Sequence, residues 1–402
     1  MRKVNPENNS PTLFDLGTLV APLETHSRST KSFFGSQRDA SAVKSKIVVD
    51  YFTAWSNIMK SRVGKIGYLD FFSGPGTYSD GTESTPLQIV RKVIADPRLC
   101  EITMTLFEDK DPEATQSLSN ALAQVDGIEK LKLAPKLSHG ESVRTHIEEY
   151  FQSRAIVPTF MFLDPFGYVG LTRTLMQAIL KDWGCELAFY FNFNRINAAV
   201  RNSTVRSRMD ELFGNDRVEA AKAVLNMHPD EVTRERILLD SLRDALYEIG
   251  AKHVLCYRFR RPTGCIDHHL VFATKNLDPA QKIMKGIMAR VSSTIDSDGV
   301  GSFEFNPSLP NAPLPLAQES PTQRLAKDLM QSFHGRQMTV AEIYAAHNEG
   351  TPFTIGNYQQ ALRILAYDEH AVTVERGEFM PLTSNNVARR HMSEQYRITF
   401  PS

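Results

Sequence analysis

Two short segments of the sequence combine small residues with acids at spacings that suit ligand binding. The first, Asp70-Phe-Phe-Ser-Gly-Pro-Gly76, follows a short apolar run, which predicts a buried strand that ends in a tight loop. Small residues let the backbone approach a ligand closely, and the next helix N-terminus offers free N–H groups. The third glycine of the dinucleotide fingerprint is missing, which argues against a pyrophosphate ligand. The alternative interpretation is an ordinary turn.

The second segment is Asp164-Pro-Phe-Gly167, which follows the apolar run 158–163. A carboxylate or a neighbouring carbonyl at this place accepts a hydrogen bond from an amino group and directs its lone pair at an electrophilic methyl group. We therefore predict that Asp164, Pro165 and Phe166 are catalytic, with Phe166 or Tyr168 stacking on a flat base, and we add Asn192 from a later strand end. The alternatives are a capped turn with Phe166 packed inward, and a turn role for Asn192.

Acids follow three successive predicted strands. Asp70 suits a ligand that carries an ammonium group, such as the amino-acid part of S-adenosylmethionine, whereas Glu108 is placed to accept both hydroxyls of a ribose and Glu141 to reach an adenine. Open α/β sheets bind ligands at the carboxyl ends of their strands, although a single acid there is commonly a solvated charge. The predicted cofactor-binding residues are Asp70, Ser73, Gly74, Gly76, Glu108 and Glu141.

Cysteine and metal chemistry are not expected. The four cysteines are scattered without a CxxC pair, which argues against a zinc knuckle and a disulfide framework. No His–Asp pair is placed to activate a cysteine, and the sequence has no metal-ligand spacing. We interpret His139, His268 and His269 as structural residues.

The elements that position these residues alternate between two periods. Apolar runs at 66–72, 101–107, 130–134, 158–163 and 186–193 predict strands, and helical patterns separate them. Residues 195–250 read as helices only, and 253–260 with 267–274 predict a hairpin that adds an antiparallel strand at the sheet edge. The fold class is therefore α/β: a Rossmann-like, mostly parallel sheet with a helical insertion.

The C-terminal part follows another pattern. Three short amphipathic helices and then a hairpin, with strands at 371–374 and 379–382, predict a winged helix-turn-helix. The predicted organisation is a loosely held arm at 1–38, the Rossmann-like domain at 39–293 with its insertion at 195–250, a linker at 294–320 and the winged-helix domain at 321–402.

Charge and hydropathy limit the function classes. The 402 residues include 46 Lys+Arg and 46 Asp+Glu, so a globally basic nucleic-acid coat is excluded, but a local basic face is not. The sequence has neither an apolar run long enough to span a bilayer nor a secretory signal, so a cytoplasmic protein without membrane contact is expected. The candidate nucleic-acid-binding residues are Lys44, Lys46, Arg195 and Arg201, with a solvated helix face as the alternative.

Taken together, the motifs resemble the three-Cys-motif partner protein family over nearly the whole chain after residue 40. The segments that carry this resemblance are Lys44, Tyr51–Trp55, Tyr68–Gly76, Tyr78, Gly81, Ser84–Leu87, Phe162–Gly167, Leu270–Thr274 and Tyr396–Phe400. The resemblance implies a bacterial protein encoded beside a three-Cys-motif protein, which itself looks like a radical S-adenosylmethionine enzyme. The resemblance therefore implies a protein partner but does not imply a particular chemical reaction.

More distantly, residues 40–293 are similar to class I S-adenosylmethionine-dependent methyltransferases. This similarity implies a cofactor-loop role for the Asp70–Gly76 segment, a ribose-binding role for Glu108 and a catalytic-loop position for Asp164-Pro-Phe. In amino-group methyltransferases of nucleic acids that loop reads [DNS]-P-P-[YFW], and here Phe166 replaces the second proline. The Asp-Pro-Phe-Gly form is similar to that of tRNA guanosine dimethyltransferases.

Two functions follow from the sequence. The first is an amino-group methyltransferase that uses S-adenosylmethionine and acts on nucleic acid or on a substrate delivered by the partner. The alternative is a catalytically inactive methyltransferase-like fold that binds DNA, RNA or protein, in a phage or mobile-element context. The third winged-unit helix, Gly356–Arg363, carries little positive charge, which favours protein contact over groove reading.

Overall fold

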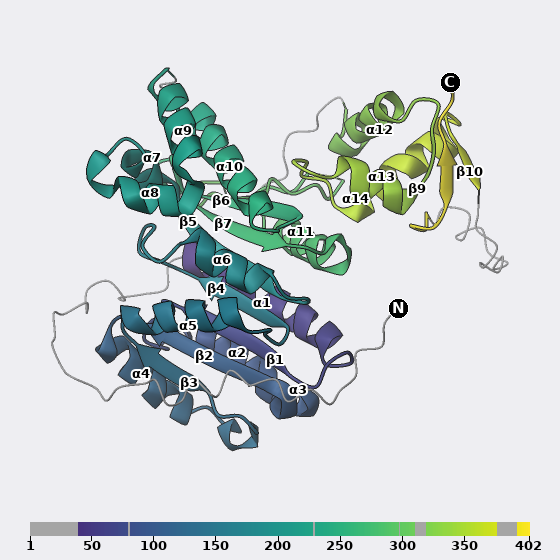
Figure 1. The fold of residues 1–402 in the computed structure, drawn as a ribbon. Helices are drawn as coiled ribbons and strands as arrows, with labels where there is room; N and C mark the ends of the chain where they lie inside the picture. The colour runs from purple at the N-terminus through teal and green to yellow at the C-terminus, as the bar shows by residue number, and fades with distance from the viewer. Residues whose placement is uncertain (1–38, 79–80, 228–229, 297, 310–318, 376–391) are drawn as a thin grey trace. The chain divides into compact units, whose positions relative to one another are not determined.

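The computed structural model describes residues 39–78, 81–227, 230–296, 298–309, 319–375 and 392–402, with only the backbone described at 39 and 141–145. The chain divides into two compact units (Figure 1). Unit 1 holds the chain up to Cys256 together with Ile266–Asn276, and unit 2 holds Tyr257–Cys265 and Leu277–Ser402. The predicted arm at 1–38 lies outside the described residues.

Among the described residues, the large sheet has eight strands in the order β3-β2-β1-β4-β5-β7-β6-β8. Neighbouring strands from β3 to β5 run parallel, and β7 is antiparallel to β5. This order is that of the class I methyltransferase type of Rossmann-like fold, so the predicted fold class is confirmed. The strands are β1 (Ile66–Phe71), β2 (Thr103–Asp109), β3 (Lys136–His139), β4 (Thr159–Leu163), β5 (Glu186–Asn192), β6 (His253–Arg260), β7 (Ile266–Thr274) and β8 (Glu304–Phe305).

Helices cover both faces of this sheet (Figure 1). On one face, α1 (Asp39–Met59) packs aromatic rings on the strands: Tyr51 lies 5.0 Å from Phe160 and Phe52 lies 5.3 Å from Tyr68, measured between ring centroids. The alternate strand residues form a second apolar core with α5 (Glu141–Ser153) and α6 (Arg173–Leu180). Because both faces are buried, the interiors of β1, β4 and β5 are mostly apolar, and β2 alternates Thr103 and Thr105 with apolar residues.

The helices between β1 and β3 begin at local sequence signals. Proline occupies the first turn of α2 (Thr85–Ile94), α3 (Pro97–Ile102) and α4 (Pro112–Ala123). Asp96 caps α3, so that Glu101 and Ile102 are helical although the sequence predicts a strand from Glu101. The third strand was also predicted at the wrong place. The sequence predicts it at 130–134, whereas β3 follows at Lys136–His139 and has only one buried residue.

The described chain between β5 and β6 is helical, in agreement with the insertion expected from the sequence. Its α-helices are α7 (Phe193–Ala199), α8 (Arg206–Phe213), α9 (Asn215–Met227) and α10 (Glu231–Glu248). A buried hydrogen bond ties the insertion to the sheet, since His269 Nε2 of β7 lies 2.5 Å from Glu235 Oε1 of α10. This contact gives His269 the structural role that the sequence suggests.

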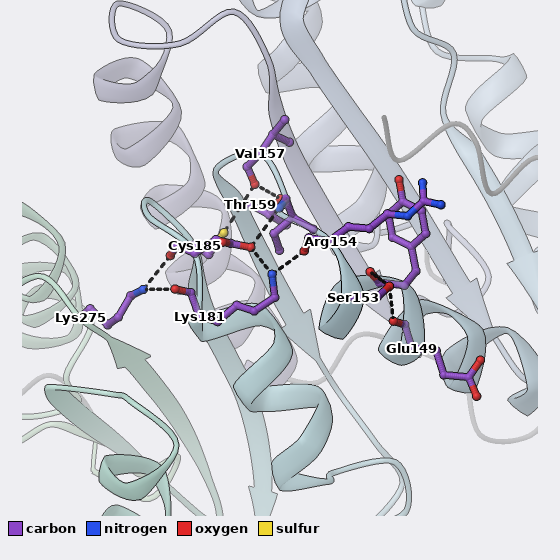
Figure 2. Close-up of polar contacts among 11 residues, drawn as sticks. Glu149, Ser153, Arg154, Val157, Thr159, Lys181, Cys185 and Lys275 are labelled. Atoms are coloured by element: carbon purple, nitrogen blue, oxygen red, sulfur yellow. Dashed lines mark hydrogen bonds and ion pairs between the residues drawn. The ribbon is translucent and has the colours of Figure 1, made fainter. Parts of the chain in front are cut away.

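The amino ends of the central strands are tied together by local polar contacts (Figure 2). Lys275 Nζ donates to the carbonyls of Lys181 at 2.9 Å and Asp182 at 2.8 Å, and Cys185 Sγ donates to the Val157 carbonyl at 3.5 Å. Burial raises the pKa of the Cys185 thiol to about 12, so this cysteine stays protonated at neutral pH. These contacts lie at the edge of the sheet opposite to the carboxyl ends of the parallel strands.

Unit 2 contains the predicted winged helix-turn-helix. Its helices α12 (Pro321–Ser332), α13 (Val340–His347) and α14 (Ile355–Arg363) are the three short helices that the sequence predicts. A small sheet follows the order β10-β11-β9, from β10 (Thr373–Glu375), β11 (Arg397–Thr399) and β9 (Gln337–Thr339). The strand predicted at 379–382 lies outside the described residues. Helix α11 (Lys282–Arg290) and the segment 294–309, predicted as the end of the first domain and part of a linker, belong to this unit.

A buried lysine joins α11 to α13 within unit 2. Lys285 is 1% exposed, and its Nζ donates to the Asn348 carbonyl at 2.7 Å. Gln281 Nε2 donates to Asn348 Oδ1 at 2.6 Å, and Tyr344 donates to Gln281 Oε1 at 2.9 Å. Burial lowers the pKa of Lys285 to about 7, although Glu349 opposes this shift electrostatically.

We therefore expect the stability of unit 2 to rise between pH 7 and pH 9. Above pH 7 the folded unit loses the Lys285 proton while the unfolded chain keeps it, so unfolding takes up a proton and becomes harder as pH rises, by at most about 1.4 kcal/mol per pH unit. Hydrogen exchange of α11 and α13 amides, corrected for intrinsic rates, measures this rise. Lys285→Met should abolish it, and Lys327→Met, at an exposed lysine of α12, should not. An equal rise in all three proteins would contradict the assignment.

Candidate functional site

The two segments singled out in the sequence lie side by side at the carboxyl edge of the sheet. Strands β1 and β4 are neighbours, with Phe71 opposite Leu163, and the backbone N–H of Asp164 donates to the Phe71 carbonyl at 3.2 Å. Phe71 also lies opposite Glu108 of β2. Asp164, the β1 loop and Glu108 therefore share one edge, as the sequence requires for a common site.

The β1 loop is held in a fixed shape by the end of β2. Phe72 N–H and Ser73 N–H both donate to the Glu108 carbonyl, at 2.7 and 2.9 Å, and Gly74 N–H donates to Asp109 Oδ2 at 3.0 Å. Phe72, a non-glycine residue, has a φ of 73°. Such backbone conformations cost energy and persist where the surrounding structure imposes them, which is common at ligand sites.

Gly76 lets this loop pack closely on α4. Its φ is 82°, and a Cβ at this position would lie 3.0 Å from both Ala121 Cβ and Leu118 Cδ1. Ser117 Oγ of the same helix donates to the Pro75 carbonyl at 2.9 Å. The loop glycine thus serves close helix packing, the role of the third glycine in a dinucleotide fold, although the spacing differs from that fingerprint.

Two of the predicted strand-end acids are buried. Asp70 is 2% exposed, and burial raises the pKa of its carboxyl well above the usual value, although the hydrogen bond from Tyr68 Oη at 3.1 Å opposes the shift. Glu108 is fully buried and lies opposite Ser138 of β3. Ser138 is 2% exposed, and its hydroxyl makes no hydrogen bond within the described part of the chain. A ligand hydroxyl or ring nitrogen beside Glu108 would satisfy it.

The third acid and one unexpected neighbour complete this region. Glu141 is the first residue of α5, just after β3, and its side chain lies outside the described residues. Asp109, the residue next to the predicted Glu108, anchors the loop, because its two oxygens accept from Gly74 N–H and Asp111 N–H. Its adjacency to Glu108 in an acidic pair was the available signal.

The β4 loop presents an aromatic ring beside a paired carboxylate. Pro165 is buried, whereas Phe166 is 39% exposed, so the ring is not packed inward as in the capped-turn alternative. Lys110 Nζ lies 5.8 Å from the Phe166 ring centroid. Asp164 pairs with Lys44 Nζ of α1, and their side chains are 26% and 13% exposed. An exposed ring flanked by a cation suits a flat ligand with a nearby negative charge.

Strand β5 adds groups that sequence reasoning missed. Lys44 Nζ lies 4.6 Å from the centroid of the Tyr190 ring, and that ring lies 5.2 Å from His268 of β7. Asn192 caps α7, since its Oδ1 accepts from Arg195 N–H at 3.0 Å, and its Nδ2 faces His268 Nε2 at 3.1 Å. Both ends of the Asn192 side-chain amide therefore already have partners within the chain, which favours a capping role over the predicted catalytic one.

The four candidate nucleic-acid-binding residues are not brought together by described contacts. Lys44 is turned into the site instead of lying on a phosphate-binding face, because Asp164 pairs with it. Lys46 is exposed and pairs with Asp50 one helical turn away at 2.9 Å. Arg195 donates to the Phe166 carbonyl at 3.5 Å, and Arg201 donates to the Leu225 carbonyl at 3.2 Å.

Within the described residues, no group of three or more His, Cys, Asp or Glu side chains is arranged to hold a metal ion. The same part of the chain has no helix that is both long and apolar enough to cross a membrane.

Comparison with known proteins supports a winged helix at the C-terminus. Residues 293–372 match a family described as the GMT-like wHTH domain. That match covers α12, α13 and α14, the three helices of the predicted winged unit. The chain is thus a methyltransferase-like fold joined to a winged helix-turn-helix. None of the curated proteins compared with this sequence matches it.

Solved structures that match include methyltransferases at low similarity. The DszA carbon methyltransferase is 12% identical with a TM-score of 0.36, and the match covers 61% of this chain and 57% of that one. Trm1 from Pyrococcus horikoshii, solved with S-adenosylmethionine, is 15% identical with a TM-score of 0.32, covering 89% and 94%. Protein LPL1258 from Legionella pneumophila is 10% identical with a TM-score of 0.37, covering 61% and 89%. Similarities this low do not bear on substrate or cofactor.

Proposed function

We propose that unit 1 binds S-adenosylmethionine at the carboxyl edge of its sheet and transfers the methyl group to an amino group. The observation that carries this proposal is the direct junction of the β1 and β4 loops through Asp164 N–H and the Phe71 carbonyl. The residues present fit such a nucleoside. Glu108 and the Ser138 hydroxyl offer a buried acceptor and donor for a ribose or ring, and the Ser73–Gly76 backbone allows close approach.

The chemistry asks little of the protein beyond positioning. When bound, the cofactor supplies an electrophilic methyl group on a positively charged sulfur. Asp164 and the adjoining loop accept a hydrogen bond from the acceptor amino group and so aim its lone pair, while Phe166 stacks on the ring that carries it. Holding two reactants in line accounts for much of the rate gain in such a transfer.

Calorimetry tests the cofactor half of the proposal. The full chain should bind S-adenosylmethionine and its demethylated product S-adenosylhomocysteine, both with one site per chain. Asp70→Arg should abolish binding of both, because an Arg side chain at this 2% exposed position disrupts the end of β1. The matched control is Asp50→Arg on the solvent side of α1, which should bind normally. No binding by the wild-type protein at high concentration would end the proposal.

We further propose that the acceptor amino group belongs to a nucleic acid, or to a substrate that a three-Cys-motif partner protein delivers. The exposed Phe166 ring with Lys110 and Arg195 nearby supports a base with an adjacent phosphate. Radioactive methyl transfer to RNA, DNA and the co-expressed partner distinguishes these acceptors.

A second candidate is a partner-binding protein without catalysis. Two observations favour it. First, Lys44 already forms an ion pair with Asp164. Second, Arg363 is the one cationic residue of α14, whereas a helix that reads the DNA major groove needs more positive charge. Under this alternative, the chain binds its partner equally well with or without cofactor, and Asp164→Ala leaves the biological activity intact.

A further inference from the structure

The ammonium of Lys44 lies where a methyl acceptor is expected. Helix α1 brings it to the carboxyl edge, where it pairs with Asp164 and lies 4.6 Å from the centroid of the Tyr190 ring. Carboxylate on one side and an aromatic face on another are the groups that bind cations in proteins. The Lys44 ammonium therefore already contacts the two groups, the Asp164 carboxylate and the Tyr190 ring, that would otherwise bind a cationic ligand.

Lys44 keeps its charge in this position. Burial lowers the pKa of its ammonium, but Asp164, Tyr78 and Asp70 raise it, and the net pKa lies above the ordinary lysine value. The pair orients the Asp164 side chain and places a positive charge directly against it. A neutral N–H group can still donate to the remaining lone pairs of the Asp164 carboxylate, which has more acceptor sites than Lys44 uses.

We propose that Lys44 is a positioning residue that restricts the methyl acceptor to an uncharged amino group, as on a nucleobase ring, and excludes alkylammonium groups such as those of lysine side chains or polyamines. This inference rests on the proposed function. An alkylammonium would have to approach both the Lys44 ammonium and the positive sulfur, and like charges at close range disfavour binding.

A ring amino group meets no such barrier. Its nitrogen forms the bond to the methyl carbon as the carbon–sulfur bond breaks, and the electron pair of that bond stays on sulfur. The nitrogen then releases one proton to solvent, which leaves a neutral methylamino group and a neutral thioether. Asp164 accepts a hydrogen bond throughout and needs no second charge.

Sinefungin provides a test that does not need the acceptor. This analogue of S-adenosylmethionine carries an amine-bearing carbon in place of the methylated sulfur, so that its ammonium extends toward the acceptor position. In the wild-type protein, Lys44 should oppose that ammonium. In Lys44→Met, Asp164 loses its internal partner, and we expect the affinity for sinefungin relative to S-adenosylhomocysteine to rise roughly tenfold.

Three further variants make the test specific. Lys44→Arg keeps the charge and should keep the wild-type affinity ratio, and Lys46→Met, two residues away on the exposed face of α1, should also leave it unchanged. Asp164→Asn should lower the ratio, because the Lys44 ammonium then loses the carboxylate that pairs with it. This variant tests the inference if Lys44→Met does not fold.

The outcomes separate the inference from the proposed function. If the wild-type protein binds neither analogue, the proposed function fails. If S-adenosylhomocysteine binds but Lys44→Met and Asp164→Asn leave the ratio unchanged, the cofactor site stands and the inference about Lys44 is wrong. A higher ratio in Lys46→Met as well would also overturn it, since the effect would then be one of overall charge.

Discussion

Asp164→Asn should lower methyl transfer by about 10²–10³-fold while S-adenosylhomocysteine binds within about twofold of wild type. The amide is nearly the same size, so the turn Asp164–Gly167 and the backbone hydrogen bond to Phe71 remain. It loses the negative charge that pairs with Lys44 and that, under the proposed function, holds the acceptor amino group. The measurement is the rate of radioactive methyl incorporation, at saturating cofactor, into whichever of RNA, DNA or the partner is labelled by the wild-type protein.

The matched control is Asp50→Asn. Asp50 also pairs with a lysine of α1, Lys46, but that pair lies on the solvent side, and exposed ion pairs contribute little. Full activity in Asp50→Asn with loss in Asp164→Asn assigns the effect to the site. Equal rates in Asp164→Asn and wild type would exclude Asp164 from the reaction.

The arrangement of the sheet could be predicted because its signals are local and strong. The runs that became β1, β4 and β5 are apolar over nearly their whole length, and strands buried on both faces have that pattern. Asp70 and Asp164 come at the carboxyl ends of two such runs, which predicted that they share one edge. The winged unit was predictable for a similar reason, since its three helices are short and amphipathic; capping boxes begin two of them, at Ser320 and Thr339.

The contents of the site were less predictable, because they depend on how α1 is rotated against the sheet. Lys44 and Lys46 are two residues apart on α1, yet one pairs with Asp164 and the other faces solvent. The sequence holds no local signal for this difference, which is set by the packing of Tyr51 and Phe52 on the strands. The contact of Tyr190 with Lys44 was not predictable either, because Tyr190 lies within an apolar strand and resembles a core residue.

The position of β3 and the division of the chain into units differ from the sequence-based expectations. Strand β3 lies at the sheet edge and buries only Ser138, so its sequence carries no apolar pattern and the prediction fell on the preceding residues. The division of the chain also differs from the expected one. The Pro- and Ser-rich stretch after residue 293 suggested a linker, but α11 belongs to unit 2 through the Lys285–Asn348 contact, which no sequence pattern indicates.

Gly76→Val should abolish cofactor binding, with a loss of at least about 100-fold in affinity for S-adenosylhomocysteine, and should destabilise unit 1 by about 2–4 kcal/mol. A valine cannot easily adopt a φ of 82°, and its Cβ would lie 3.0 Å from Leu118 and Ala121 of α4. The loop must therefore move away from α4 or change its backbone, and either movement displaces the Gly74 N–H from Asp109. Calorimetry measures the affinity, and urea unfolding followed by Trp55 and Trp183 fluorescence measures the stability.

Substitutions at two other glycines separate the effect of backbone strain from the effect of steric contact with α4. Gly81 has a similar φ of 83°, but a Cβ at this position would meet no heavy atom of the described residues within 4 Å, so Gly81→Ala should cost stability only through backbone strain. Gly64 has neither a positive φ nor a close neighbour in the described part of the chain, and Gly64→Ala should leave affinity and stability unchanged. If Gly76→Val lost stability but kept its affinity for S-adenosylhomocysteine, the β1 loop would be a packing element alone. The ligand would then have to bind away from the junction of β1 and β4, where Asp164 could not reach it.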